Sequence, residues 1–271
     1  MNTYFFLGLA EFVIAMFVFF VLGANDWIAS SSEDDCVTEK SPEGDNLCFC
    51  EEFHSGMVKQ PSNTWSNLGF VAAGLFLLAQ LGSGDPATAP NPMVVATLFS
   101  VMYGLIVIFL GPGSMYFHAS MKEWAGWIDT FSMILFTGFL FVYDLANLLH
   151  AGTAVFLILY LIVVVGLGYF SAKVSRVGPL SGGAFSFGTL ALLWAVAQFP
   201  ILLGNWGGIQ REWPFFILAF LGFGSAMFVW ARSQSGGPWC NPKSWLQGHA
   251  IWHLLTALTT VFIFFYLASG A

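Results

Sequence analysis

Long apolar runs alternate with short polar connections along almost the whole chain. An apolar run of about 20 residues is long enough to cross the hydrocarbon core of a bilayer as a helix. We expect membrane helices in the runs near residues 4–23, 64–82, 93–114, 127–149, 153–171, 183–203, 213–231 and 248–269. The pattern predicts an all-α membrane protein, built as a seven-transmembrane-helix bundle with an additional N-terminal hydrophobic helix.

The polar connections divide the chain into three parts. These are an N-terminal transmembrane helix or signal segment, an acidic extramembrane segment and a seven-helix domain, at residues 1–23, 24–62 and 63–271. The small residues Gly23 and Ala24 would suit signal-peptide cleavage, but no Lys or Arg precedes the first apolar run, as a signal peptide requires. We therefore expect the first helix to be retained.

Composition supports a membrane protein. Only 8% of the residues are charged and 57% are hydrophobic, whereas a soluble domain carries about 25% charged residues. The net charge of −7 comes mainly from the acidic segment, which a solvated loop explains. No basic patch is present, so nucleic acid is not an expected partner. The acidic residues of this segment are Glu33, Asp34, Asp35, Glu39, Glu43, Asp45, Glu51 and Glu52.

Four cysteines fall in polar connections. Cys36, Cys48 and Cys50 lie in the acidic segment, and Cys240 lies in the last connection. A disulfide between these connections is conceivable, but four cysteines allow several pairings, and the sequence does not choose among them.

Three of the five histidines are expected at one membrane depth, together with a serine and an aspartate. Two crossings separate the acidic segment from Ser114 and His118, which therefore lie on the same face as that segment. Asp129 opens the next apolar run at that face. Four crossings later the chain returns to the same face at His249 and His253.

The residue types and their spacing predict a catalytic zinc site. His249 and His253 are four residues apart, so both imidazoles lie on one side of a helix and can reach one metal ion, with His118 as the third ligand. Asp129 would act as general base or orient a ligand, and Ser114 would donate a hydrogen bond to a developing oxyanion. The alternative is that the histidines are structural, because a single intramembrane histidine usually is.

The motifs resemble those of the alkaline ceramidase family, part of a wider superfamily of seven-helix membrane hydrolases that includes adiponectin-receptor-like proteins. They are NTWSN (63–67), GSMYFH (113–118) followed by Asp129, and QGHAIWH (247–253), and the resemblance covers about residues 46–270. The run CNPKSWLQGH (240–249) resembles the bacterial-type branch most. The resemblance implies hydrolysis of ceramide to a sphingoid base and a free fatty acid. It also implies zinc on His118, His249 and His253, assisted by Ser114 and Asp129.

The family also implies a calcium ion near the start of the bundle. Glu51 and Glu52 match its pattern and are the candidate ligands, and calcium takes six to eight oxygen ligands. The chain departs from the family's other calcium-binding positions at Cys48, Phe49, Phe53 and Gln60.

Charge predicts the orientation in the membrane. All Lys and Arg residues except Arg211 lie in segments on the face of the histidines, so the positive-inside rule places the zinc face toward the cytoplasm. The cysteines of the acidic segment would instead suit an oxidising compartment.

Other functions were weighed beside a lipid amidase. A seven-helix receptor or lipid-binding protein with a structural zinc would not need Ser114 and Asp129. A hydrolase of another acyl lipid, such as a glycerophospholipid ester, could use the same site. A retinal photoreceptor is excluded, because the last run, 248–269, contains no lysine for a Schiff base. The substrate partner is a membrane lipid in either hydrolase, and no feature of the sequence indicates an oligomeric state.

Overall fold

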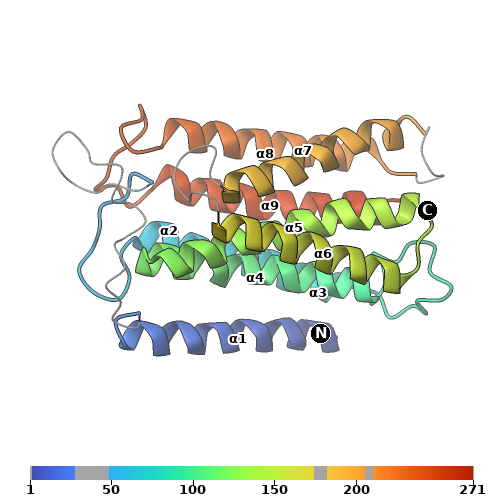
Figure 1. Ribbon diagram of the computed structural model, residues 1–271, viewed down its shortest axis with the longest axis horizontal. Helices are drawn as coiled ribbons and strands as arrows, with labels where there is room; N and C mark the ends of the chain where they lie inside the picture. Colours follow the sequence, from blue (N-terminus) through green and yellow to red (C-terminus); the bar gives the residue numbers. More distant parts are fainter. Residues whose placement is uncertain (1, 28–48, 174–181, 205–209, 271) are drawn as a thin grey trace.

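The computed structural model describes residues 2–27, 49–173, 182–204 and 210–270, and all regular elements in them are helices (Figure 1). Cys36, Cys48 and the acidic residues from Glu33 to Asp45 lie outside the described residues. The helices are α1 (Thr3–Ala24), α2 (Pro61–Ser66), α3 (Leu68–Gln80), α4 (Leu98–Ser120), α5 (Glu123–Leu148), α6 (Thr153–Lys173), α7 (Gly182–Leu202), α8 (Trp213–Arg232) and α9 (Gly248–Ala268).

The helices confirm the predicted membrane architecture. Seven of those described are long and apolar enough to cross a membrane, namely α1 and α4 to α9. The remaining predicted span, near 64–82, is formed by α2 and α3 together. These two helices are separated only by Asn67, which itself has α-helical dihedral angles. The chain therefore forms a seven-helix bundle of α2–α3 and α4 to α9, with α1 as the additional N-terminal helix.

Close packing around α4 forms the core of the bundle. α4 contacts α3 and α5 along most of its length and α1 along part of it. A Cβ atom on Gly74 of α3 would lie 2.7 Å from the Gly104 carbonyl oxygen of α4. Small residues at such crossings let membrane helices approach closely, since van der Waals packing rather than hydrophobic burial joins them in lipid. By contrast, α6 and α8 expose many large apolar side chains, as surfaces facing lipid do.

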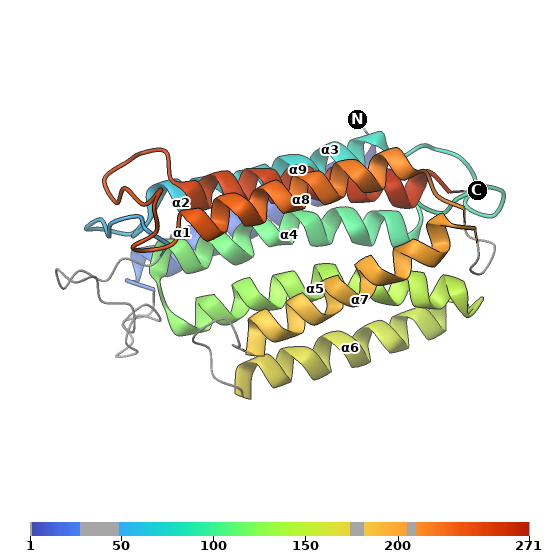
Figure 2. The same cartoon turned by 90° about the horizontal axis from the view of Figure 1, so that it is seen from above.

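The ends of the bundle differ in what they contain. Both termini lie at one end, whereas the C-terminus of α4 and the N-terminus of α9 lie at the other (Figure 1). The residues that precede α2 and the connection between α8 and α9 also lie at this second end, which we call the histidine end. From above, α5, α6 and α7 form one side of the bundle, and α3, α8 and α9 form the other (Figure 2).

Candidate metal centre

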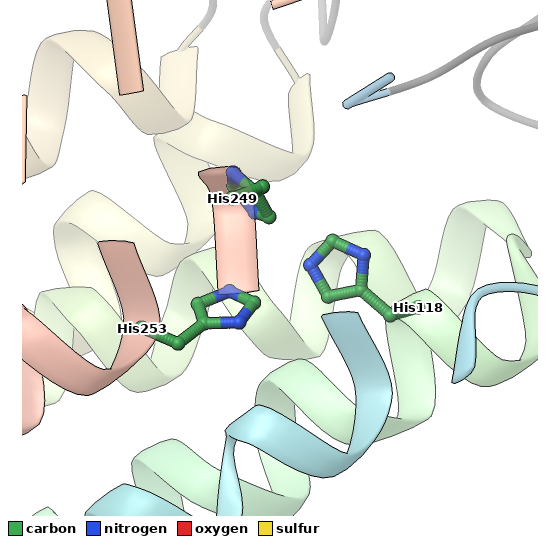
Figure 3. Close-up of side chains that lie close together, drawn as sticks. All are labelled: His118, His249 and His253. Carbon is green, nitrogen blue, oxygen red and sulfur yellow. The ribbon is translucent and has the colours of Figure 1, made fainter. Parts of the chain in front are cut away.

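Three buried histidines meet at the histidine end. His118 lies in the last turn of α4, and His249 and His253 lie in the first two turns of α9. Their ring centroids are 4.5 to 5.1 Å apart, and the rings gather around one point between the two helices (Figure 3). One nitrogen or more from each ring lies within 4.8 Å of the others. The structure therefore brings together the three predicted ligands.

The unpaired nitrogen atoms of this cluster fit a bound metal ion. Buried polar side-chain atoms nearly always have a hydrogen-bond partner. His249 Nδ1 and His253 Nε2 are buried and have none among the described residues. An imidazole nitrogen with a free lone pair is a common zinc ligand, and catalytic zinc sites often have three such ligands. The donor set thus suits zinc.

Two of the rings are held by polar side chains that the sequence motifs did not identify as functional. His118 Nδ1 lies 2.9 Å from Gln60 Oε1, and His253 Nδ1 lies 2.8 Å from Ser66 Oγ. Both partners belong to α2 or cap it. The only signal in the sequence was their place in and next to the NTWSN motif, which suggests no role for either side chain.

Aromatic rings hold the third histidine. His249 stacks on Phe49 at a centroid distance of 4.2 Å and on Trp252 at 5.3 Å. Phe49 also meets His118 edge-on, so that its ring contacts two of the three histidines. Phe49 has a φ of 52°, a conformation that is uncommon for a bulky residue and is often found where function constrains the backbone. The sequence identified Phe49 only as a departure from the calcium-binding pattern.

Ser114 and Asp129 lie on neighbouring helices at the same end. Ser114 is buried, one turn before His118 in α4, and its side chain hydrogen-bonds to the Asp129 carboxylate of α5. Tight packing joins these helices here, since a Cβ atom on Gly113 would lie 3.0 Å from the Ser132 side chain. Asp129 is not among the residues whose ligand atoms cluster within 4.8 Å. The two residues are therefore placed next to each other beside the cluster rather than within it.

Glu51 caps a helix, whereas Glu52 does not share its contacts. The Glu51 carboxylate accepts the backbone N–H groups of Ser62 and Asn63 at 2.7 and 2.8 Å. Burial raises the pKa of this carboxyl, and the two N–H groups lower it. The Gln60 amide oxygen, which is bonded to His118, also accepts from Asn63 Nδ2 at 3.3 Å. These contacts account for Glu51 and Gln60 without an ion, and the described residues offer too few further oxygens for calcium, which needs six to eight.

A disulfide joins the residues before α2 to the connection before α9. Cys50 and Cys240, which are 190 residues apart in sequence, are bonded to each other. Further contacts run beside it, since Glu52 N donates to Pro242 O and Ser62 Oγ donates to Trp245 O. The pairing left open by the sequence is thereby assigned for these two cysteines.

Comparison with known proteins adds one finding to this geometry. A protein-family model described as "Ceramidase" matches residues 42–269, which include every predicted site residue. No curated protein matches the chain.

Proposed function

Because the chain belongs to the ceramidase family, we propose that it is a zinc-dependent intramembrane amidase that hydrolyses ceramide to a sphingoid base and a free fatty acid. The family implies a hydrolase with a lipid substrate, and the helices make it a multi-pass membrane protein. The identity of the metal and the particular reaction are our proposal. The observation that carries it is the buried cluster of His118, His249 and His253, with unpaired nitrogen atoms directed into it.

His118, His249 and His253 would hold the zinc ion. When bound there, zinc would supply Lewis acidity toward the amide carbonyl and lower the pKa of a water molecule to about 7. Three protein ligands leave one position of a tetrahedral ion open for water or substrate. A structural zinc site, in contrast, usually has four protein ligands. The three-histidine set therefore favours an enzyme over a receptor with a structural metal.

Asp129 and Ser114 would carry the proton and the hydrogen bond that amide hydrolysis needs. We assign Asp129 as general base, which accepts a proton from the attacking water and passes it to the leaving amine nitrogen. Ser114 would donate its hydroxyl proton in a hydrogen bond to the oxyanion that forms on the carbonyl oxygen. Their mutual hydrogen bond and their position one turn from His118 and across from it support this division of roles.

The position of the cluster suits a substrate that stays in the membrane. The histidines lie in the last turn of one membrane helix and the first turns of another, so they lie near one edge of the bilayer rather than at its centre. The amide of ceramide lies between two hydrocarbon chains and a polar head, and therefore at the same depth. An ester of another acyl lipid would reach the same depth, which makes it the competing substrate.

Two observations bear on the side of the membrane that the histidine end faces. The positive-inside rule predicts the cytoplasm, whereas the Cys50–Cys240 disulfide at that end is typical of an oxidising compartment. We give the disulfide more weight, because it is a specific pairing of distant residues while the charge rule is a statistical bias over few residues. We therefore propose that the histidine end faces the oxidising side.

The test of the proposed function combines metal content with lipid cleavage. Detergent-purified protein should contain one zinc per chain by elemental analysis and release fatty acid from ceramides but not from glycerophospholipids. Zinc together with cleavage of phospholipid esters alone would replace the amidase by an esterase. Zinc without cleavage of any lipid would favour a receptor or lipid-binding protein.

A further inference from the structure

The short helix α2 contacts two of the three histidines although it contributes no metal ligand. Gln60, its N-cap residue, bonds to His118 of α4, and Ser66, its last residue, bonds to His253 of α9. We infer that Gln60 and Ser66 are positioning residues that fix the orientation and the protonation of these two imidazoles. The inference rests on the metal centre of the proposed function and adds two residues that act through its ligands.

Gln60 holds His118 through both its backbone and its side chain. Its backbone N–H donates to the His118 carbonyl at 3.1 Å, and its side-chain Nε2 donates to the Glu51 carbonyl at 3.2 Å. Because the amide nitrogen is directed to Glu51, the amide oxygen faces His118 Nδ1 and can only accept. The proton of a neutral His118 must then be on Nδ1, which leaves the lone pair of Nε2 for a metal.

Ser66 imposes the same tautomer on His253. Its hydroxyl donates to the Asn63 carbonyl at 3.0 Å, so its oxygen is left to accept from His253 Nδ1 at 2.8 Å. The lone pair of His253 is therefore on Nε2, the buried atom with no partner in the described chain. A metal-bound histidine almost always donates its other ring N–H to an acceptor in this way.

α2 is itself held in place from several sides. The Glu51 carboxylate caps its first N–H groups, and the neighbouring Cys50 is bonded to Cys240 in the connection that leads into α9. Ser62 Oγ joins α2 to the same connection through Trp245 O at 2.7 Å. One anchored element thus sets the ligands of two separate membrane helices, and a site supported in this way keeps its geometry when no metal is bound.

Zinc affinity of purified variants tests the inference without any lipid substrate. Ser66→Ala removes the acceptor for His253, whereas Ser62→Ala, in the same helix, removes a hydroxyl that contacts no histidine. We expect Ser66→Ala to weaken zinc binding about 10- to 100-fold, as the loss of such a partner typically does, and Ser62→Ala to leave it unchanged. Ser66→Thr, which keeps the hydroxyl, should restore the affinity. Competition with a chelator of known affinity measures each value.

Gln60→Met and Gln60→Glu form the second pair. Gln60→Met removes the acceptor for His118 at similar length and should weaken zinc binding to the same extent, while Gln60→Glu keeps an acceptor oxygen and should restore it. Replacement of zinc by cobalt gives a visible absorption spectrum that reports ligand geometry. It should shift in Ser66→Ala and Gln60→Met but not in Ser62→Ala.

The outcomes separate this inference from the proposed function. A Ser66→Ala protein that binds zinc like Ser62→Ala, or a failure of Ser66→Thr to restore binding, would overturn the inference even if Gln60→Met did not fold. Zinc binding that responds as expected in a protein that cleaves no ceramide would overturn the amidase and leave the inference standing. A wild-type chain that binds no zinc would overturn both.

Discussion

The guanidinium of Arg211 and the carboxylate of Asp144 form an ion pair in which the two side chains are only 2% and 6% exposed. Asp144 lies near the end of α5 that is farthest from the histidines. Its carboxylate also accepts from Trp194 Nε1 at 2.8 Å and from Gln198 Nε2 at 2.9 Å. The pair thus ties α5 to α7 and to the residues before α8. It also neutralises the one basic residue that the charge rule assigns to this face.

We expect Asp144→Asn to destabilise the fold while sparing the metal centre. The substitution keeps the size of the side chain but leaves the Arg211 charge buried without its partner, which costs about 3–5 kcal/mol. Thermal unfolding in detergent should show a much lower midpoint, with zinc content unchanged. Glu212→Gln, at the exposed neighbouring residue, is the control. Equal midpoints for both variants would show that the pair contributes little.

Replacement of any one ligand histidine should abolish both zinc retention and turnover. His118→Ala, His249→Ala and His253→Ala each leave two ligands, too few for a stable zinc site. His150→Asn is the control, because His150 is exposed at the opposite end of α5 with a φ of 50° that Asn tolerates. Elemental analysis and fatty-acid release measure the two effects. One fully active ligand variant would contradict the proposed centre.

Asp129→Asn should keep zinc but lose most activity. A positioned general base contributes about 10²- to 10⁴-fold to a rate, and the amide that replaces it cannot accept the proton. Ser114→Ala should also retain zinc and lower kcat, since it removes one donor to the oxyanion. Steady-state kinetics on a ceramide, together with zinc content, measure both. Wild-type turnover in Asp129→Asn would assign the base to another group.

Removal of calcium at a fixed zinc concentration should leave activity and thermal stability unchanged. The Glu51 carboxylate already accepts two backbone N–H groups, and the Gln60 amide oxygen is bonded to His118. A calcium-selective chelator with buffered zinc provides the measurement. A clear loss of stability that added calcium reverses would instead support the prediction of Glu51 and Glu52 as calcium ligands.

Fusions to the C terminus should report a cytoplasmic location for that end. The C terminus lies at the end of the bundle opposite the Cys50–Cys240 disulfide (Figure 1). A fluorescent protein that folds only in the reducing cytoplasm should therefore fluoresce when fused there. A phosphatase that needs oxidising conditions should be inactive at the same position. The reverse pattern would place the histidine end in the cytoplasm, as the charge rule predicts.

Much of the architecture could be predicted because it depends on local pattern. Apolar runs of membrane-spanning length identify the helices, and counting their crossings predicts that His118, His249 and His253 meet at one end. The structure confirms this meeting. Helix ends were predicted less well. α4 begins at Leu98 rather than near 93 and continues past Pro112 to Ser120, since capping and packing rather than hydrophobicity decide where a helix begins and ends.

The sequence by itself determined the membrane helices, their order and the three candidate ligands, because hydrophobic length and residue type act along the chain. Only the tertiary structure decided which side chains support those ligands. The contacts of Gln60 with His118, of Ser66 with His253 and of Phe49 with His249 join residues between 58 and 200 positions apart. Such contacts depend on how helices pack in space. A hydrogen bond between distant segments leaves no periodic signal in either of them.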